Sequence, residues 1–158
     1  MATLERALEI AARAHAGTVD HHQQPYILHP LRVMMGVDDP VAQIVAILHD
    51  VVEDTSVTFD DLRREGFSLT VLDALELVTH ESGTPYADYV IACRPNPIAR
   101  QVKLADLRDN SRIDRAILRE EKLGRDLKRM RRYVLSYQYL MDQLTESEYR
   151  ERMVDAEK

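Results

Sequence analysis

The sequence predicts an all-α fold, and three observations favour it. Apolar residues recur at helical spacing along most of the chain, and no segment shows the sustained alternation of a strand. The five glycines and six prolines fall where helices would begin or end. A length of 158 residues suits one domain with a closed core, so we expect a single helical bundle over residues 1–158.

The first two predicted helices are separated by a polar loop. Residues 3–15 carry an amphipathic apolar face, and Gly17 is a plausible end for that helix. Thr18 to Gln24 form the loop, and loops on rigid scaffolds often carry specificity. The second helix is predicted to start at His29-Pro30, because proline suits the first helical position.

A third helix is predicted from Pro40 through Asp54. Its residues up to Val52 are apolar on almost every side, which is typical of a central helix. The remaining elements follow from capping residues ahead of periodic runs. Further starts are expected at Thr58, Ser68, Thr84-Pro85 and Asn96-Pro97, and a long charged helix near 123–143 is expected before a short tail.

Composition narrows the classes of function. The 21 basic and 27 acidic side chains give a formal charge of −6, which disfavours an extended nucleic-acid surface. No apolar run approaches the roughly 18 to 20 residues of a membrane span, and the N-terminus lacks a signal-peptide layout. The single cysteine, Cys93, fits a reducing compartment and a place in the core. We expect a cytoplasmic protein without nucleic-acid or membrane partners, and leave a homo-oligomer open.

Four ionisable residues stand out in LHDVVEDT, residues 48–55, because the rest of this stretch is apolar. His49 and Glu53 are four residues apart, as are Asp50 and Asp54, so a continuous helix would project all four to one side. Burying such groups without partners is strongly unfavourable. We therefore expect a cation or strong hydrogen-bond donors to face them.

A divalent metal ion is one such cation, because adjacent His and Asp supply one nitrogen and one oxygen ligand. Two ligands do not complete a site. His29 and Asp106 are candidates for the others, although a helical His or Asp is often purely structural. Lys103 and Asn110 lie one turn to either side of Asp106 on the same helical face, which is an arrangement that suits phosphate groups.

Taken in order, these motifs resemble those of the HD superfamily of metal-dependent phosphohydrolases. Within it, the chain is similar to the small alarmone hydrolases and to the hydrolase domain of the Rel/SpoT enzymes. The resemblance covers about residues 4–113, which leaves 114–158 as a C-terminal helical extension. The matching stretches are PYILHP (25–30), LHDVVEDT (48–55), TFDDL (58–62), LVTH (77–80) and VKLADLRDNSR (102–112).

The resemblance implies an HD-type helical bundle that holds one divalent ion per chain, commonly Mn²⁺. The implied reaction removes the 3′-pyrophosphate from a hyperphosphorylated purine nucleotide, either ppGpp and pppGpp or the adenine equivalents ppApp and pppApp. The implied metal ligands are His29, His49, Asp50 and Asp106.

The resemblance also implies the residues around the metal. Glu53 and Asp54 match the catalytic acidic pair of hydrolase-active members, and such a carboxylate can orient or deprotonate water. Lys103, Asn110 and Arg112 are expected to hold phosphates or ribose. Two other functions stay open: a different HD phosphohydrolase such as a nucleoside 5′-monophosphatase, or a catalytically silent nucleotide-binding module.

The region expected to bind the base departs from the family pattern. The loop HAGTVDH puts Asp20 where the family usually has a stacking Arg, and His21 where it has a Lys; Ile113 replaces a usual Thr. A carboxylate cannot stack as a guanidinium does. Asp20 could accept from a base amino group, His21 or His22 could supply the stacking, or the substrate could be another nucleotide.

Overall fold

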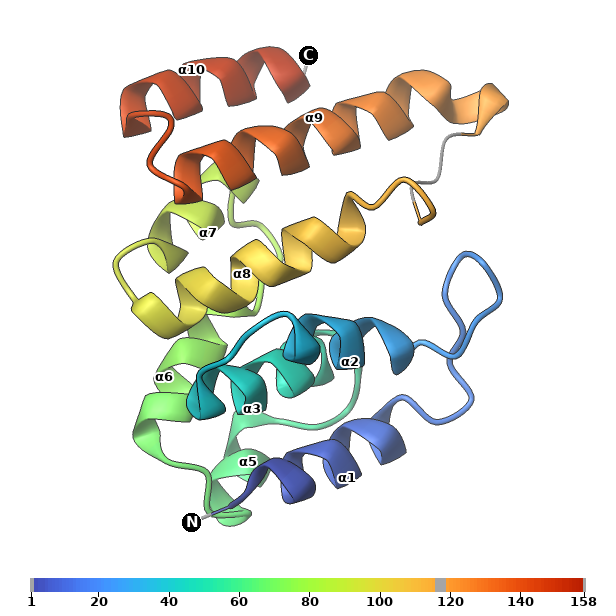
Figure 1. Ribbon diagram of the computed structural model, residues 1–158, viewed down its shortest axis with the longest axis vertical. Helices are drawn as coiled ribbons and strands as arrows, with labels where there is room; N and C mark the ends of the chain where they lie inside the picture. The colour runs from blue at the N-terminus through green and yellow to red at the C-terminus, as the bar shows by residue number, and fades with distance from the viewer. Residues whose placement is uncertain (1, 116–118, 158) are drawn as a thin grey trace.

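The computed structural model describes residues 2–115 and 119–157, and it is all-α as predicted (Figure 1). These two ranges contain no strand, only an isolated antiparallel bridge between Val19 and Pro25. The described helices are α1 (Leu4–Ala14), α2 (Leu28–Met35), α3 (Pro40–Leu48), α4 (Val51–Asp54), α5 (Phe59–Arg64), α6 (Leu69–Val78), α7 (Tyr86–Cys93), α8 (Pro97–Asn110), the 3-10 turn η1 (Glu120–Lys122), α9 (Leu123–Leu140) and α10 (Glu146–Glu157).

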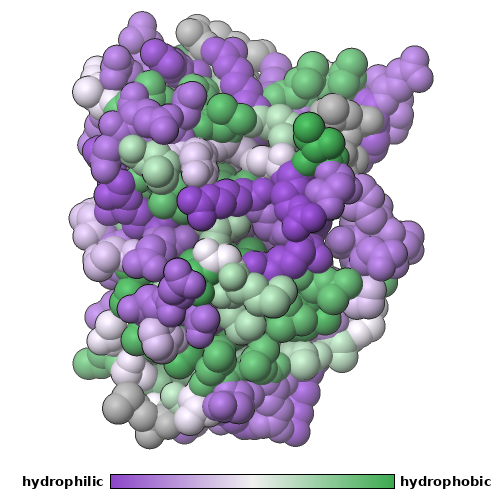
Figure 2. All heavy atoms as spheres, viewed as in Figure 1, coloured by the Kyte–Doolittle hydropathy of each residue, from purple (hydrophilic) through white to green (hydrophobic). Residues whose placement is uncertain are grey.

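The helices follow one another in layers, as Figure 1 shows from the blue N-terminal end to the red C-terminal end. α3 lies at the centre of the lower half and packs against α1, α2, α6 and α8. α8 is the middle layer, and α9 and α10 follow above it. Figure 2 shows hydrophilic residues over α8 on this face and hydrophobic residues over α2 below it. No helix of the described ranges is both long and apolar enough to cross a membrane.

Helix starts agree with the capping residues in the sequence. Asp39 Oδ1 accepts from the N–H groups of Val41 and Ala42 at 2.8 and 2.9 Å, with Pro40 in the first turn. Thr58 and Asp61 form a reciprocal capping box. Ser68 and Asn96 cap α6 and α8 in the same manner, which fixes where the central helices begin.

The second helix starts earlier than predicted, at Leu28 in place of Pro30. The N–H of Leu28 donates to the Pro25 carbonyl and that of His29 to the Tyr26 carbonyl, so a turn leads directly into the helix. Pro30 still falls within the first turn, where its missing N–H is tolerated. His29 is therefore the second residue of α2 and lies within its first turn.

The prediction of one helix from Pro40 to Asp54 is wrong, because the helix is interrupted at His49 and Asp50. His49 Nδ1 donates to the carbonyl of Ala46 at 2.7 Å. In a continuous helix that carbonyl would accept from the Asp50 N–H. The His49 side chain thus takes the place of a backbone donor, and the helix resumes as α4 at Val51.

The predicted short tail is a helix, α10, that completes the core. Tyr149, Met153 and Ala156 are buried, at a spacing of four and three that indicates an apolar helical stripe. The Tyr149 ring stacks on Tyr139 of α9, with centroids 4.6 Å apart, and its hydroxyl bonds with Ser136 at 2.8 Å. The C-terminal extension is therefore part of the hydrophobic core of the bundle.

We expect Leu48→Ala to lower the free energy of unfolding by about 2 to 5 kcal/mol, because Leu48 is fully buried in the central helix and its loss leaves a cavity. Urea denaturation monitored by circular dichroism measures the change. Leu69→Ala is the matched control: Leu69 is 73% exposed, so its truncation should cost within about 0.5 kcal/mol. Equal losses for the two variants would contradict the placement of α3 at the centre.

Candidate functional site

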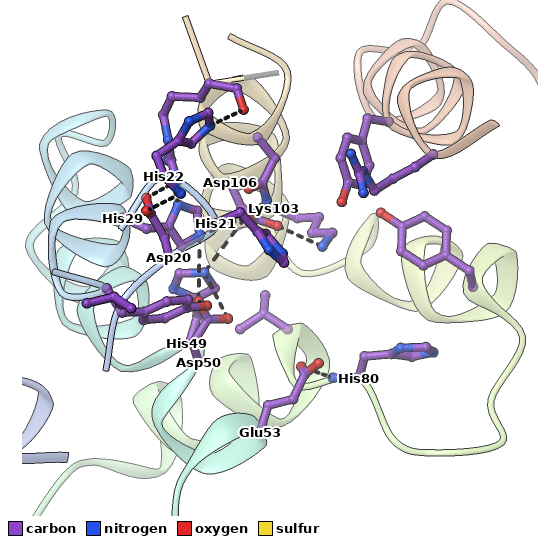
Figure 3. Close-up of a pocket in the computed structure, with 18 of the residues that line it drawn as sticks. Asp20, His21, His22, His29, His49, Asp50, Glu53, His80, Lys103 and Asp106 are labelled. Carbon is purple, nitrogen blue, oxygen red and sulfur yellow. Dashed lines mark hydrogen bonds and ion pairs between the residues drawn. The ribbon is translucent and has the colours of Figure 1, made fainter. Parts of the chain in front are cut away.

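A cavity of about 640 Å³ lies between α2, the α3–α4 break, α8 and α9. Nine of the eleven residues that the sequence singled out line it (Figure 3), although they come from four separate segments. They are Asp20, His21, His29, His49, Asp50, Glu53, Lys103, Asp106 and Asn110.

Four donor groups converge at the inner end of the cavity. His29 Nε2 lies 3.3 Å from Asp106 Oδ1 and 3.6 Å from Asp50 Oδ2. His49 Nε2 lies 3.2 Å from Asp50 Oδ1 and 3.8 Å from Asp106 Oδ1. Among the described residues, the donors of His29, His49 and Asp50 lie within 4.8 Å of one another. Two imidazoles and two carboxylates at this spacing form a possible divalent-metal site.

The orientation of His49 fits a metal ligand. Because its Nδ1 donates to the Ala46 carbonyl, a neutral ring presents the Nε2 lone pair to the cavity. That nitrogen is buried and makes no hydrogen bond among the described residues. A buried polar atom without a partner is costly, so the arrangement calls for a cation at this point.

His29 is oriented by a carboxylate that the sequence analysis missed. Its Nδ1 lies 2.6 Å from Asp109 Oδ2, and Asp109 also accepts from Arg32 Nε at 2.7 Å. Asp109 is 5% exposed, so these contacts are sheltered from water. A carboxylate on the far nitrogen fixes a histidine's tautomer and ring direction. Asp109 follows Asp106 by three residues, a spacing that could have identified it as a second buried acid on α8.

Asp106 occupies the predicted face of α8 with Lys103 and Asn110. Its Oδ2 accepts from Lys103 Nζ at 2.8 Å and its Oδ1 from Asn110 Nδ2 at 2.6 Å. Burial alone would raise the pKa of Asp106, but the Lys103 ammonium and the two histidines outweigh it and hold that pKa well below its ordinary value. Asp106 is therefore ionised, as a metal ligand must be.

Glu53 extends into the cavity one turn beyond Asp50. Its Oε2 accepts from the backbone N–H of His80 at 2.9 Å, which anchors one oxygen (Figure 3). Burial raises the pKa of the Glu53 carboxyl above its ordinary value, against the opposing His80 bond, and the charges of Asp50 and Asp54 add to the rise. A carboxyl so placed can exchange a proton near neutral pH more readily than an exposed one.

Asp54 is not among the residues that line the cavity, although it lies beside Asp50, which does. Its carboxylate instead contacts Tyr26 of the loop that precedes α2. The Tyr26 hydroxyl lies 2.7 Å from Asp50 Oδ2 and 3.2 Å from Asp54 Oδ2. Asp54 is thereby linked to the metal-facing group through a shared hydroxyl.

Arg112 also lies outside the cavity: its side chain is half exposed and pairs with Asp114 at 2.7 Å. Arg115, three residues later, lines the cavity in its stead. Sequence reasoning missed Arg115 because it follows the end of α8, where no periodicity shows its direction. Arg129 and Tyr133 of α9 also contribute to the wall, as do Tyr86 and Tyr89 of α7.

Known proteins resemble this chain along most of its length. A protein of Streptomyces coelicolor named GTP pyrophosphokinase is 33% identical over 131 residues, 75% of this chain and 15% of that protein. A guanosine-3′,5′-bis(diphosphate) 3′-pyrophosphohydrolase of Aquifex aeolicus is 32% identical over 132 residues, 75% of this chain and 18% of that protein. The human protein named guanosine-3′,5′-bis(diphosphate) 3′-pyrophosphohydrolase MESH1 is 35% identical over 128 residues, 70% of this chain and 71% of that protein. The chain belongs to this pyrophosphohydrolase family.

The family resemblance first drawn from the five motifs is thus confirmed. The chain spans only 15% and 18% of the two bacterial relatives, so the activities of those whole proteins do not transfer with the match. No protein-family model matches the chain. A solved structure titled "A metazoan ortholog of SpoT hydrolyzes ppGpp and plays a role in starvation responses" matches with a TM-score of 0.61 and 22% identity, over 90% of this chain and 96% of that one. This likeness shows that the family's helical fold is present here.

Proposed function

We propose that the protein is a metal-dependent hydrolase that removes the 3′-pyrophosphate from a hyperphosphorylated purine nucleotide, either ppGpp and pppGpp or ppApp and pppApp. The observation that carries the proposal is the convergence of His29, His49, Asp50 and Asp106 in one cavity with Glu53 beside them. The family relationship supports the same reaction. Location in the cytoplasm and oligomeric state stay predictions.

We propose that the four converging residues hold one Mn²⁺ per chain. Two neutral nitrogens and two carboxylate oxygens suit a divalent first-row ion. Such an ion supplies Lewis-acid chemistry when bound, by polarising a phosphoryl oxygen and making water more acidic. Among this chain's own residues, Asp109 orients His29 and Tyr26 orients Asp50, so two of the ligands are fixed in advance.

Glu53 is the proposed proton carrier. The His80 N–H holds one of its oxygens, which leaves the other directed to the cavity where water would attack phosphorus. Attack at the 3′-linked phosphorus breaks its bond to the ribose oxygen, and that oxygen must gain a proton as it leaves. Asp54 is the proposed partner of Glu53, and it acts on Asp50 through the Tyr26 hydroxyl.

The cavity wall carries the groups that would neutralise the phosphates. Lys103 is buried beside Asp106, with its ammonium 4.7 Å from the centre of the Tyr89 ring. Asn110 and Lys103 share the α8 face that looks onto the metal ligands. These positions support roles in holding phosphate or ribose oxygens as charge shifts during transfer.

The test is a substrate panel: purified protein with Mn²⁺ is incubated with ppGpp, ppApp and their pentaphosphates. Pyrophosphate and phosphate are measured separately. We expect pyrophosphate from at least one of the four, together with the matching nucleoside 5′-diphosphate or 5′-triphosphate. Phosphate released from mononucleotides would favour a 5′-monophosphatase, and tight binding of a nucleotide and the metal without turnover would favour a binding module. Absence of pyrophosphate with all four substrates rejects the proposal.

We expect Asp109→Asn to weaken Mn²⁺ binding by about 10- to 100-fold, because without the carboxylate the His29 ring is no longer held in its orientation. The amide keeps the size of the side chain and can still accept from Arg32. Titration calorimetry measures the affinity, and thermal unfolding checks that the fold persists. Asp88→Asn is the control, since Asp88 lies on the outside of α7 and pairs with Arg150. An unchanged affinity in Asp109→Asn would contradict the orienting role.

A further inference from the structure

Two segments that are far apart in the sequence meet at one end of the cavity. The loop of residues 18–25 approaches the segment that follows α8, and His22 Nε2 lies 3.1 Å from the Arg115 carbonyl (Figure 3). The Arg115 guanidinium lies 3.6 Å from Asp20 Oδ2. Both segments line the cavity, so their contact sets the shape of this end.

Asp20 uses its two oxygens for different tasks. Oδ1 accepts from the backbone N–H groups of His22 and Gln24 at 2.8 and 3.0 Å, which builds the loop. Gln23 takes a left-handed backbone with φ of 59°, and the Val19–Pro25 bridge closes the turn. Oδ2 is left to face Arg115, so the carboxylate is already engaged by the protein.

The other side of the Arg115 guanidinium contacts Asp109 Oδ2, the same oxygen that receives His29 Nδ1. Arg115 Nη1 also lies 3.3 Å from His29 Nδ1. The side chains of Asp20, Arg115 and Asp109 are 12%, 17% and 5% exposed. One sheltered guanidinium therefore spans from the loop to the carboxylate that orients a metal-facing histidine.

We propose that Arg115 is a positioning residue that determines nucleotide specificity, by fixing the loop of residues 18–25 against the cavity through the Asp20–Arg115–Asp109 bridge. The proposal rests on the proposed function. His21 and Asp20 reach the cavity only from this loop, so the loop's position decides which base fits there. A guanidinium reaches this end of the cavity from beyond α8, although the loop itself carries an acid at position 20.

The first measurement is hydrogen exchange of the loop without nucleotide. Removing a charged partner from a sheltered bridge should speed exchange of the His22 and Gln24 amides about tenfold in Arg115→Ala. Asp20→Asn should do the same, because the amide keeps Oδ1 but loses the charge that Arg115 meets. Arg63→Ala, which breaks only a surface pair with Asp60, is the control and should leave loop exchange unchanged.

The second measurement is nucleotide affinity, taken in a Glu53→Gln background so that turnover is slow while binding is measured. We expect Arg115→Ala to weaken binding about tenfold and to change the ratio of guanine to adenine affinities by at least about threefold. The double variant Asp20→Asn with Arg115→Ala should lose no more than either single variant, because both remove one bridge. Arg115→Lys should restore part of the affinity, since it keeps the charge without the planar fork.

Unchanged loop exchange in Arg115→Ala would overturn the proposal, as would an unchanged ratio of base affinities or additive losses in the double variant. These outcomes are separate from the failure of the proposed function. If the wild type released pyrophosphate from none of the nucleotides, the hydrolase assignment would fall. Exchange and binding would still decide the role of Arg115, because neither depends on turnover.

Discussion

His49→Ala is expected to abolish Mn²⁺ binding and to reduce pyrophosphate release by about 10³-fold or more, since metal stabilisation of phosphoryl transfer is worth several kcal/mol. The physical reason is the buried Nε2 that faces Asp50 and Asp106 without a hydrogen bond among the described residues. Removing the His49 imidazole takes away one of the four proposed metal ligands. Without the metal ion, the charges of Asp50 and Asp106 repel each other. Metal content after desalting and single-turnover rates measure the two losses.

A second variant guards against a fold defect, because His49 also holds the helix break through Ala46. Asp50→Asn keeps the side-chain shape and the Tyr26 contact while it removes a charged ligand. We expect the same double loss there, with thermal unfolding unchanged. Asp88→Asn is the control, since Asp88 lies outside the cavity wall and pairs with Arg150. Full metal affinity in Asp50→Asn would exclude the proposed ligand set.

Glu53→Gln should separate metal binding from catalysis. We expect an unchanged Mn²⁺ affinity and a fall in kcat of about 10²- to 10⁴-fold, the usual contribution of a positioned acid or base. Glu53 lies one turn beyond the donors, and its glutamine replacement can still accept from the His80 N–H. The variant therefore changes the proton chemistry without moving the wall. Calorimetry with Mn²⁺ and steady-state release of pyrophosphate provide the two readouts.

Glu76→Gln provides the matched control, because Glu76 is exposed on α6 and makes no part of the cavity wall. Its kcat should equal that of the wild type. A Glu53→Gln variant that retained its full rate would remove Glu53 from the mechanism. A variant that lost the metal would instead make Glu53 a ligand, which would also contradict the division of roles.

The sequence predicted which candidate residues lie together better than it predicted the local backbone. Spacing placed His49 and Asp50 together and put Lys103, Asp106 and Asn110 on one face, because helical periodicity is a local property. The interruption at His49 was not predictable from periodicity, since it depends on a side chain that competes for the Ala46 carbonyl.

Arg115 shows the other limit of sequence reasoning. Its role depends on the approach of a loop more than ninety residues away, and no pattern within the segment after α8 indicates that contact. Asp109 and α10, in contrast to Arg115, could have been predicted from the spacing of residues in the sequence. Asp109 repeats at three residues from Asp106, and Tyr149 and Met153 begin an apolar stripe.

The stack of Tyr139 on Tyr149 provides an intrinsic spectroscopic probe of the packing between α9 and α10. The chain has seven tyrosines and no tryptophan, so tyrosine fluorescence is not quenched by energy transfer to an indole. α9 carries Tyr133 into the cavity wall on one side and Tyr139 under α10 on the other. A change in the near-ultraviolet circular dichroism of the tyrosines would therefore report a change in the packing of α9 against α10, without any attached dye.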